Sequence, residues 1–108
     1  MKTEITYQIA LTLIPGIGDI SGKKFVAYCG SAEAIFKESR KSLEKINGIR
    51  EVTIDALSSP RDILKRAEQE VEFLERNGIQ PLFYQDPDYP RRLLQCDDGP
   101  MMLYYKGN

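Results

Sequence analysis

The sequence lacks histidine altogether, which excludes several kinds of site at once. None of its 108 residues offers an imidazole for general acid–base catalysis, for a Ser-His-Asp triad or for a typical zinc site. The carboxylate pairs Asp86/Asp88 and Asp97/Asp98 occur in ordinary turn sequences, and we interpret them as turns rather than as metal ligands. We therefore expect no catalytic residue, no metal and no cofactor in this chain, which is not predicted to be an enzyme.

The sequence also lacks a long apolar segment and a cysteine framework. Nothing in it approaches the roughly 20 apolar residues that cross a bilayer, and its first residues do not resemble a secretory signal. We expect a cytoplasmic protein without a membrane partner. Cys29 and Cys96 form no CxxC pair, so free thiols are the expected state in a reducing compartment.

An excess of positive charge is missing as well. The net charge is −1, with eight basic and seven acidic residues in positions 1–59, and seven basic and nine acidic residues in positions 60–108. A protein that binds nucleic acid on its own usually carries a basic excess. We therefore expect this chain alone to bind DNA weakly.

The apolar pattern predicts helices before residue 59 and a mixed pattern after it. Helices are expected over residues 5–13, 20–28, 31–36, 39–46 and 52–57. Ser58-Ser59-Pro60 then marks a boundary before a long amphipathic helix over residues 60–77. Strands are expected at residues 79–84 and 101–105, with a short helical piece at 89–94. The predicted fold class is α+β, with an all-α domain at residues 1–59 and the start of an α/β domain at residues 60–108.

The all-α part contains an internal repeat with an offset of 32 residues. This offset maps Ile14-Pro15-Gly16-Ile17 onto Ile46-Asn47-Gly48-Ile49, and it relates the apolar positions Leu11 and Phe25 to Leu43 and Leu57. Repeated units of this kind bury their apolar faces against each other. We expect Ile17 and Ile49 to be buried at the centres of two equivalent turns.

Each turn has the character of a helix-hairpin-helix. Glycine allows the backbone to turn sharply, and the amides that open the following helix can receive a phosphate. The candidate DNA contacts are Gly16, Ile17, Gly18, Ser21, Lys23, Lys24, Gly48, Ile49, Arg50 and Thr53. The alternative is that the hairpins are structural, because Asp19 and Glu51 place negative charge where a phosphate would sit.

A further basic pair, Arg91-Arg92, follows Tyr89-Pro90. These arginines could face nucleic acid. We favour the simpler interpretation, in which Tyr89, Leu93 and Leu94 pack inward while both arginines remain solvated.

Taken in order, the motifs of the whole chain resemble the amino-terminal part of the DNA-processing protein A (DprA/Smf) family. The matching segments are the two hairpins, Tyr28-Cys29-Gly30-Ser31, Asn77-Gly78-Ile79, Tyr89-Pro90-x-x-Leu93, and Asp98-x-Pro100 running into Leu103-Tyr104-Tyr105-Lys106-Gly107. The chain departs from the family pattern at two positions. Arg50 stands where the second hairpin would have its second glycine, and Gly22 stands where many such hairpins have alanine.

The resemblance implies an amino-terminal fragment, with tandem helix-hairpin-helix repeats followed by the first elements of a Rossmann-like α/β domain. It also implies a protein that binds single-stranded DNA and assists RecA loading in natural transformation, with a homodimer of the full-length protein as one option. The main DNA-binding residues would then lie outside this chain. Two other roles stay open: a protein-interaction module whose hairpins never contact DNA, and an accessory domain of an enzyme such as a nuclease.

Overall fold

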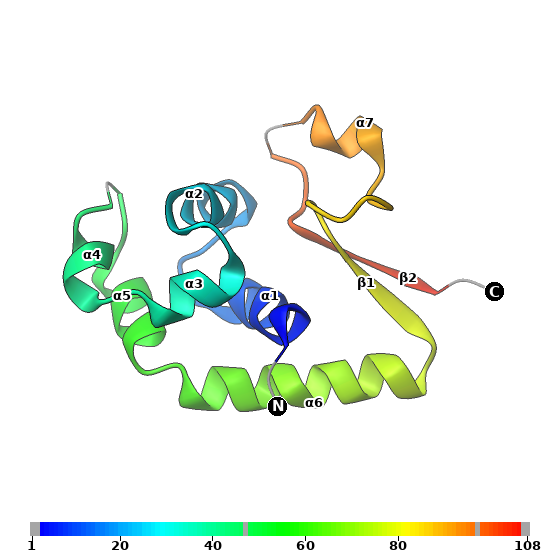
Figure 1. Ribbon diagram of the computed structural model, residues 1–108, viewed down its shortest axis with the longest axis horizontal. Helices are drawn as coiled ribbons and strands as arrows, with labels where there is room; N and C mark the ends of the chain where they lie inside the picture. Colours follow the sequence, from blue (N-terminus) through cyan, green and yellow to red (C-terminus); the bar gives the residue numbers. More distant parts are fainter. Residues whose placement is uncertain (1–2, 47, 97, 107–108) are drawn as a thin grey trace.

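The computed structural model describes residues 3–46, 48–96 and 98–106 of the chain (Figure 1). Asn47 and Asp97, which belong to a predicted helix break and a predicted turn, lie outside the described residues. The helices and strands follow the order α1 (Glu4–Leu13), α2 (Asp19–Cys29), α3 (Ala32–Lys37), α4 (Arg40–Glu44), α5 (Glu51–Ser58), α6 (Arg61–Arg76), β1 (Ile79–Phe83), α7 (Arg91–Leu94) and β2 (Met102–Lys106). The predicted α+β class is confirmed.

The short helices begin where local side-chain chemistry predicts. The Ser31 hydroxyl accepts a hydrogen bond of 3.1 Å from the backbone N–H of Ala34, and the Ser39 hydroxyl accepts one of 3.2 Å from that of Ser42. Each bond satisfies an amide that the first turn of a helix leaves without a partner. Serine capping therefore fixes the starts of α3 and α4.

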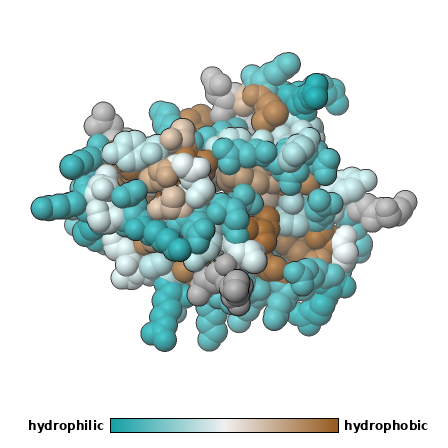
Figure 2. Space-filling model, viewed as in Figure 1, coloured by the Kyte–Doolittle hydropathy of each residue, from teal (hydrophilic) through white to brown (hydrophobic). Residues whose placement is uncertain are grey.

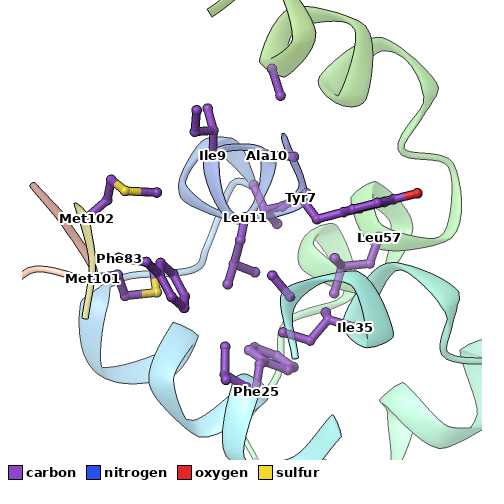
Figure 3. Close-up of a cluster of buried hydrophobic side chains, with 14 of the residues drawn as sticks. Tyr7, Ile9, Ala10, Leu11, Phe25, Ile35, Leu57, Phe83, Met101 and Met102 are labelled. Atoms are coloured by element: carbon purple, nitrogen blue, oxygen red, sulfur yellow. The ribbon is translucent and has the colours of Figure 1, made fainter. Parts of the chain in front are cut away.

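Helix α1 forms the centre of the core. It lies between α3 and α6 and also contacts β2 (Figure 1), so apolar side chains on several of its faces are buried. Leu11 points from α1 into the space between Ile35 and Leu57 on one side and Phe83 and Met101 on the other (Figure 3). Residues from both sides of the predicted boundary at Ser59 thus share one cluster of buried side chains. The division into two domains remains a prediction.

Helix α6 and the strand pair cover the rest of α1. Ala67 and Leu74 are buried on the apolar stripe of α6, whereas Phe73 beside the stripe is 51% exposed. The two strands are antiparallel, with Leu82 opposite Leu103. A two-stranded sheet is marginal by itself, so its packing on α1 and α6 stabilises it. A Rossmann-like sheet is mostly parallel, and the start of such a domain therefore remains a prediction.

Three of the burial predictions need correction. Ile17 and Ile49 are only partly buried, because the turns that carry them lie at the edge of the core rather than within it. Leu94, expected to pack inward, is 50% exposed at the end of α7, while Tyr89 is buried as predicted.

The surface is largely polar. Figure 2 shows a face that is mostly hydrophilic, interrupted by small hydrophobic patches. Within residues 3–46, 48–96 and 98–106, no helix has the length and apolar character required to cross a membrane.

Candidate nucleic-acid interface

The two predicted turns have equivalent backbones. Gly16 and Gly48, which are related by the 32-residue offset, have φ angles of +86° and +82°. These values lie in the region that favours glycine. The helices that follow begin at Asp19 and Glu51, which are related by the same offset. The repeat seen in the sequence therefore corresponds to a repeated backbone conformation.

The backbone conformation at the second glycine position of the hairpin pattern does not require glycine in this chain. Gly18 has a φ of −99° at the start of α2, and Arg50 in the equivalent position before α5 has a φ of −85°. Any L-residue adopts these angles readily. The replacement of glycine by Arg50 therefore leaves the turn intact, and it adds a cation beside it.

The two hairpins contact each other directly. The Thr53 hydroxyl on α5 donates a hydrogen bond of 2.8 Å to the backbone carbonyl of Pro15, in the first turn. Thr53 is 1% exposed. A Cβ atom on Gly16 would lie 2.3 Å from the Thr53 hydroxyl oxygen, so glycine also permits this close approach. Thr53, one of the predicted site residues, thus has a structural role in joining the turns.

A pocket of about 150 Å³ lies between the hairpins. Phe25, Ile46 and Ile49 supply its apolar part. The pocket brings together seven of the ten predicted site residues, which come from both halves of the repeat: Gly16, Ser21, Lys24, Gly48, Ile49, Arg50 and Thr53. Ile17, Gly18 and Lys23 do not line it. Phe25 and Ile46 also line the pocket, although the sequence indicates only that both are apolar positions of the repeat.

The pocket is basic. Lys24 and Arg50 are its two charged lining residues, and no carboxylate is among the described residues that line it. Both residues are exposed, and neither forms an ion pair with another described residue. Two cations from different hairpins therefore share one partly enclosed space.

Of the two acidic residues that argued against phosphate binding, Asp19 is engaged in a hydrogen bond, whereas Glu51 makes only a long ion pair. The Asp19 carboxylate accepts a hydrogen bond of 2.9 Å from the backbone N–H of Met101. Glu51 lies 4.0 Å from Arg40, which also pairs with Asp55 at 2.7 Å. The hydrogen bond to Asp55 is the main reason why the pKa of Arg40 is raised. Neither Asp19 nor Glu51 lines the pocket.

Lys23 contacts the segment that precedes β2. Its ammonium group donates a hydrogen bond of 2.7 Å to the carbonyl of Gly99 and lies 5.4 Å from the centre of the Tyr84 ring. Carbonyl and ring both attract a cation. In this structure Lys23 thus ties α2 to the strand region, at a site separate from the pocket.

The remaining candidate residues lie far along the chain. Arg91 and Arg92 open α7 and are exposed, as expected for solvated arginines. The Asp86 carboxylate accepts a hydrogen bond of 3.0 Å from the backbone N–H of Asp88, which is a local turn interaction. Among the described residues, no group of three or more Cys, Asp or Glu side chains could hold a metal ion.

Comparison with known proteins agrees with the motif order. The chain is similar to a Smf protein. The relative, Protein Smf of Synechocystis sp., is 28% identical over 106 residues, which is 98% of this chain. The predicted resemblance to the DprA/Smf family is thereby confirmed. The chain spans about a quarter of the relative's length, 26%. No family model matches the chain, and no solved structure matches it significantly.

Proposed function

We propose that this chain is part of a DNA-processing protein that binds single-stranded DNA and assists RecA loading in natural transformation. In this proposal the chain has an accessory, non-catalytic role, in which its two hairpins contact DNA phosphates. The RecA role follows from the resemblance alone, and we assign it to no residue of this chain. The contact with DNA phosphates has support from the residues themselves.

The pocket between the hairpins is the observation that carries the proposal. Lys24 and Arg50 line it from different halves of the repeat, and neither acidic residue of the two first turns, Asp19 or Glu51, is among its lining residues. Phosphate contacts of this kind supply most of the affinity in binding without sequence preference. Because residues 1–59 have a net charge of only +1, we expect a Kd of about 10⁻⁴ M or weaker at physiological salt.

One observation favours a second candidate function, a protein-interaction module. A groove of about 670 Å³ lies between α2 and the strand region. Ile20 and Leu94 line it and are 48% and 50% exposed. Exposed apolar side chains that gather at a groove are typical of protein contacts. In this second function the hairpins would hold α2 in place and would not contact DNA.

Titration with a short single-stranded oligonucleotide distinguishes the two functions. We expect NMR shifts confined to residues 16–24 and 48–53, and weaker binding as the salt concentration rises. The double variant Lys24→Gln/Arg50→Gln should weaken binding and reduce the slope of log K against log salt by about 1.4, since each lost phosphate contact on a single strand contributes about 0.7.

The matched control is Lys65→Gln/Arg66→Gln, which removes the same charge from exposed positions on α6. An equal loss of affinity in both double variants would show that DNA binding depends only on the net charge of the protein. If no residue shifts even at low salt, the hairpins do not contact DNA, and the protein-interaction function becomes the better account.

A further inference from the structure

The size of the hairpin pocket limits what it can hold. Its volume is about 150 Å³, and an engineered cavity of roughly that size holds one benzene molecule, with six heavy atoms. A phosphate group has five heavy atoms and fits such a space. A nucleoside, with its base and sugar, does not. The pocket is therefore suited to a single phosphate group rather than to a base.

The charge of the pocket indicates which kind of phosphate it suits. Lys24 and Arg50 supply two positive charges, and the Ser21 hydroxyl beside them has no hydrogen-bond partner among the described residues. A phosphate inside a DNA strand carries one negative charge, whereas a phosphate monoester carries about −1.5 to −2 at pH 7. Two cations and a free hydroxyl thus match a monoester better than a diester.

The shape of the pocket favours the end of a strand as well. An internal phosphate continues into sugar on both sides, so it needs an open groove through which the strand can pass. A terminal phosphate has a chain on one side only and can enter a partly closed space. Gly16 lines this space from one hairpin and Gly48 and Ile49 line it from the other, and the space is open to solvent on part of its boundary, where a terminal group can enter.

We propose that the pocket between the hairpins binds the phosphate monoester at the end of a single DNA strand. Lys24 and Arg50 neutralise its charge, and the Ser21 hydroxyl donates a hydrogen bond to one of its oxygens. This inference rests on the proposed function, because it specifies which part of the DNA the hairpins contact. It adds a preference for strand ends that continuous backbone binding does not predict.

Fluorescence anisotropy with labelled oligothymidylates of one length tests this preference. The strands carry a 5′-phosphate, a 3′-phosphate or hydroxyl groups at both ends, and the label is placed internally. We expect one of the phosphorylated strands to bind about tenfold more tightly than the hydroxyl strand, a difference of about 1.4 kcal/mol. Lys24→Gln/Arg50→Gln should abolish this difference, and Lys65→Gln/Arg66→Gln should preserve it. Inorganic phosphate at millimolar concentration should weaken binding of that phosphorylated strand more than binding of the hydroxyl strand.

The outcomes distinguish a failure of this inference from a failure of the function on which it rests. Equal binding of all three strands, weakened by the Lys24/Arg50 variant, would overturn the preference for strand ends while DNA contact at the hairpins stands. Binding of none of the strands at low salt would overturn both. If Ser21→Ala leaves the tenfold difference unchanged, the role of the hydroxyl is wrong, although the two cations can still hold the phosphate.

Discussion

The carboxylate of Asp19 accepts a hydrogen bond of 2.9 Å from the backbone N–H of Met101, 82 residues further along the chain. The bond joins the start of α2 to the segment that leads into β2. One turn along the same helix, Lys23 donates to the carbonyl of Gly99. The two side chains together hold the 99–101 segment against α2, so two hydrogen bonds link the first hairpin to the strand region.

Loss of the Asp19 side chain should therefore destabilise the fold beyond the effect of an ordinary surface charge. We expect Asp19→Ala to lower the free energy of unfolding by about 1 kcal/mol, since a charged acceptor strengthens a hydrogen bond but exposure weakens it. Asp62→Ala is the matched control, because Asp62 is also an exposed carboxylate in the first turn of a helix. Urea denaturation that gave equal losses for the two variants would show that the bond to Met101 contributes nothing.

Gly22 provides a second test of the same junction. A Cβ atom at this position would lie 2.1 Å from the sulfur of Met101, which is itself only 2% exposed. Alanine gains about 1 kcal/mol of helix propensity over glycine, but overpacking a buried site costs about 1–3 kcal/mol. We expect Gly22→Ala to destabilise the protein by about 1 kcal/mol in net terms.

The sign of the Gly22→Ala effect should reverse when Met101 is shortened. In a Met101→Ala background the steric conflict is gone, and the helix propensity of alanine remains. Gly22→Ala should then stabilise the protein relative to Met101→Ala alone. Thermal unfolding of the four proteins in this double-mutant cycle measures the difference, and additive effects would contradict the proposed contact.

Local chemistry predicts much of this fold, and long-range contacts account for most of what it misses. The serine caps of α3 and α4, the positive-φ glycines of the two hairpin turns and the amphipathic stripe of α6 depend on residues close in sequence. The partner of Asp19 is 82 residues away, so no local pattern indicates that this carboxylate points away from the pocket. The partial exposure of Ile17 depends in the same way on how the turn meets the core.

The candidate site likewise combines features that local sequence predicts with features that depend on long-range contacts. The 32-residue offset identifies equivalent positions in both hairpins, and the structure brings most of them to one pocket. The offset could not separate Lys23 from Lys24, because neighbours on a helix point in directions about 100° apart and the sequence does not fix which one faces the second hairpin. Only the position of the 99–101 segment, which binds Lys23, distinguishes them.

The two cysteines should differ strongly in reactivity. Both are free thiols, but Cys96 is exposed and Cys29 is partly buried. Burial is the main cause that raises the pKa of Cys29, and the charge and hydrogen bond of Glu38 raise it further. Because the thiolate is the reactive form, iodoacetamide at about pH 8 should modify Cys96→Ser far more slowly than Cys29→Ser. Glu38→Gln in the Cys96→Ser background should increase the rate at Cys29, whereas Glu33→Gln should not.

The raised pKa also fixes a direction for the pH dependence of stability. Below the ordinary pKa of cysteine, the Cys29 thiol is neutral in both the folded and the unfolded chain, and its full contribution to stability is present. As the pH rises, the unfolded chain ionises first, so this contribution is lost progressively through the higher folded-state pKa. Between pH 8 and the folded-state pKa, stability should therefore fall less steeply in Cys29→Ser than in the unmodified protein. Urea denaturation at several pH values in that range measures the free energy of unfolding of each protein. If this free energy falls equally with pH in both proteins, the pKa of Cys29 does not change on folding.

The two turn glycines offer the sharpest comparison, because they share a backbone conformation but not an environment. Gly16 and Gly48 both have positive φ angles, so alanine at either position should cost about 1 kcal/mol of backbone strain. A Cβ at Gly48 meets no atom within 4 Å, whereas a Cβ at Gly16 would displace the Thr53 hydroxyl from Pro15. Gly16→Ala should therefore cost about 1 kcal/mol more than Gly48→Ala, which is the contribution of one hydrogen bond. In a Thr53→Ala background that bond is already absent, and the two glycine variants should become equal in stability. Urea denaturation of the unmodified protein, the three single variants and the two double variants with Thr53→Ala measures these free energies. If Gly16→Ala still destabilises the protein more than Gly48→Ala when the threonine hydroxyl is absent, the hairpins are not joined through Thr53.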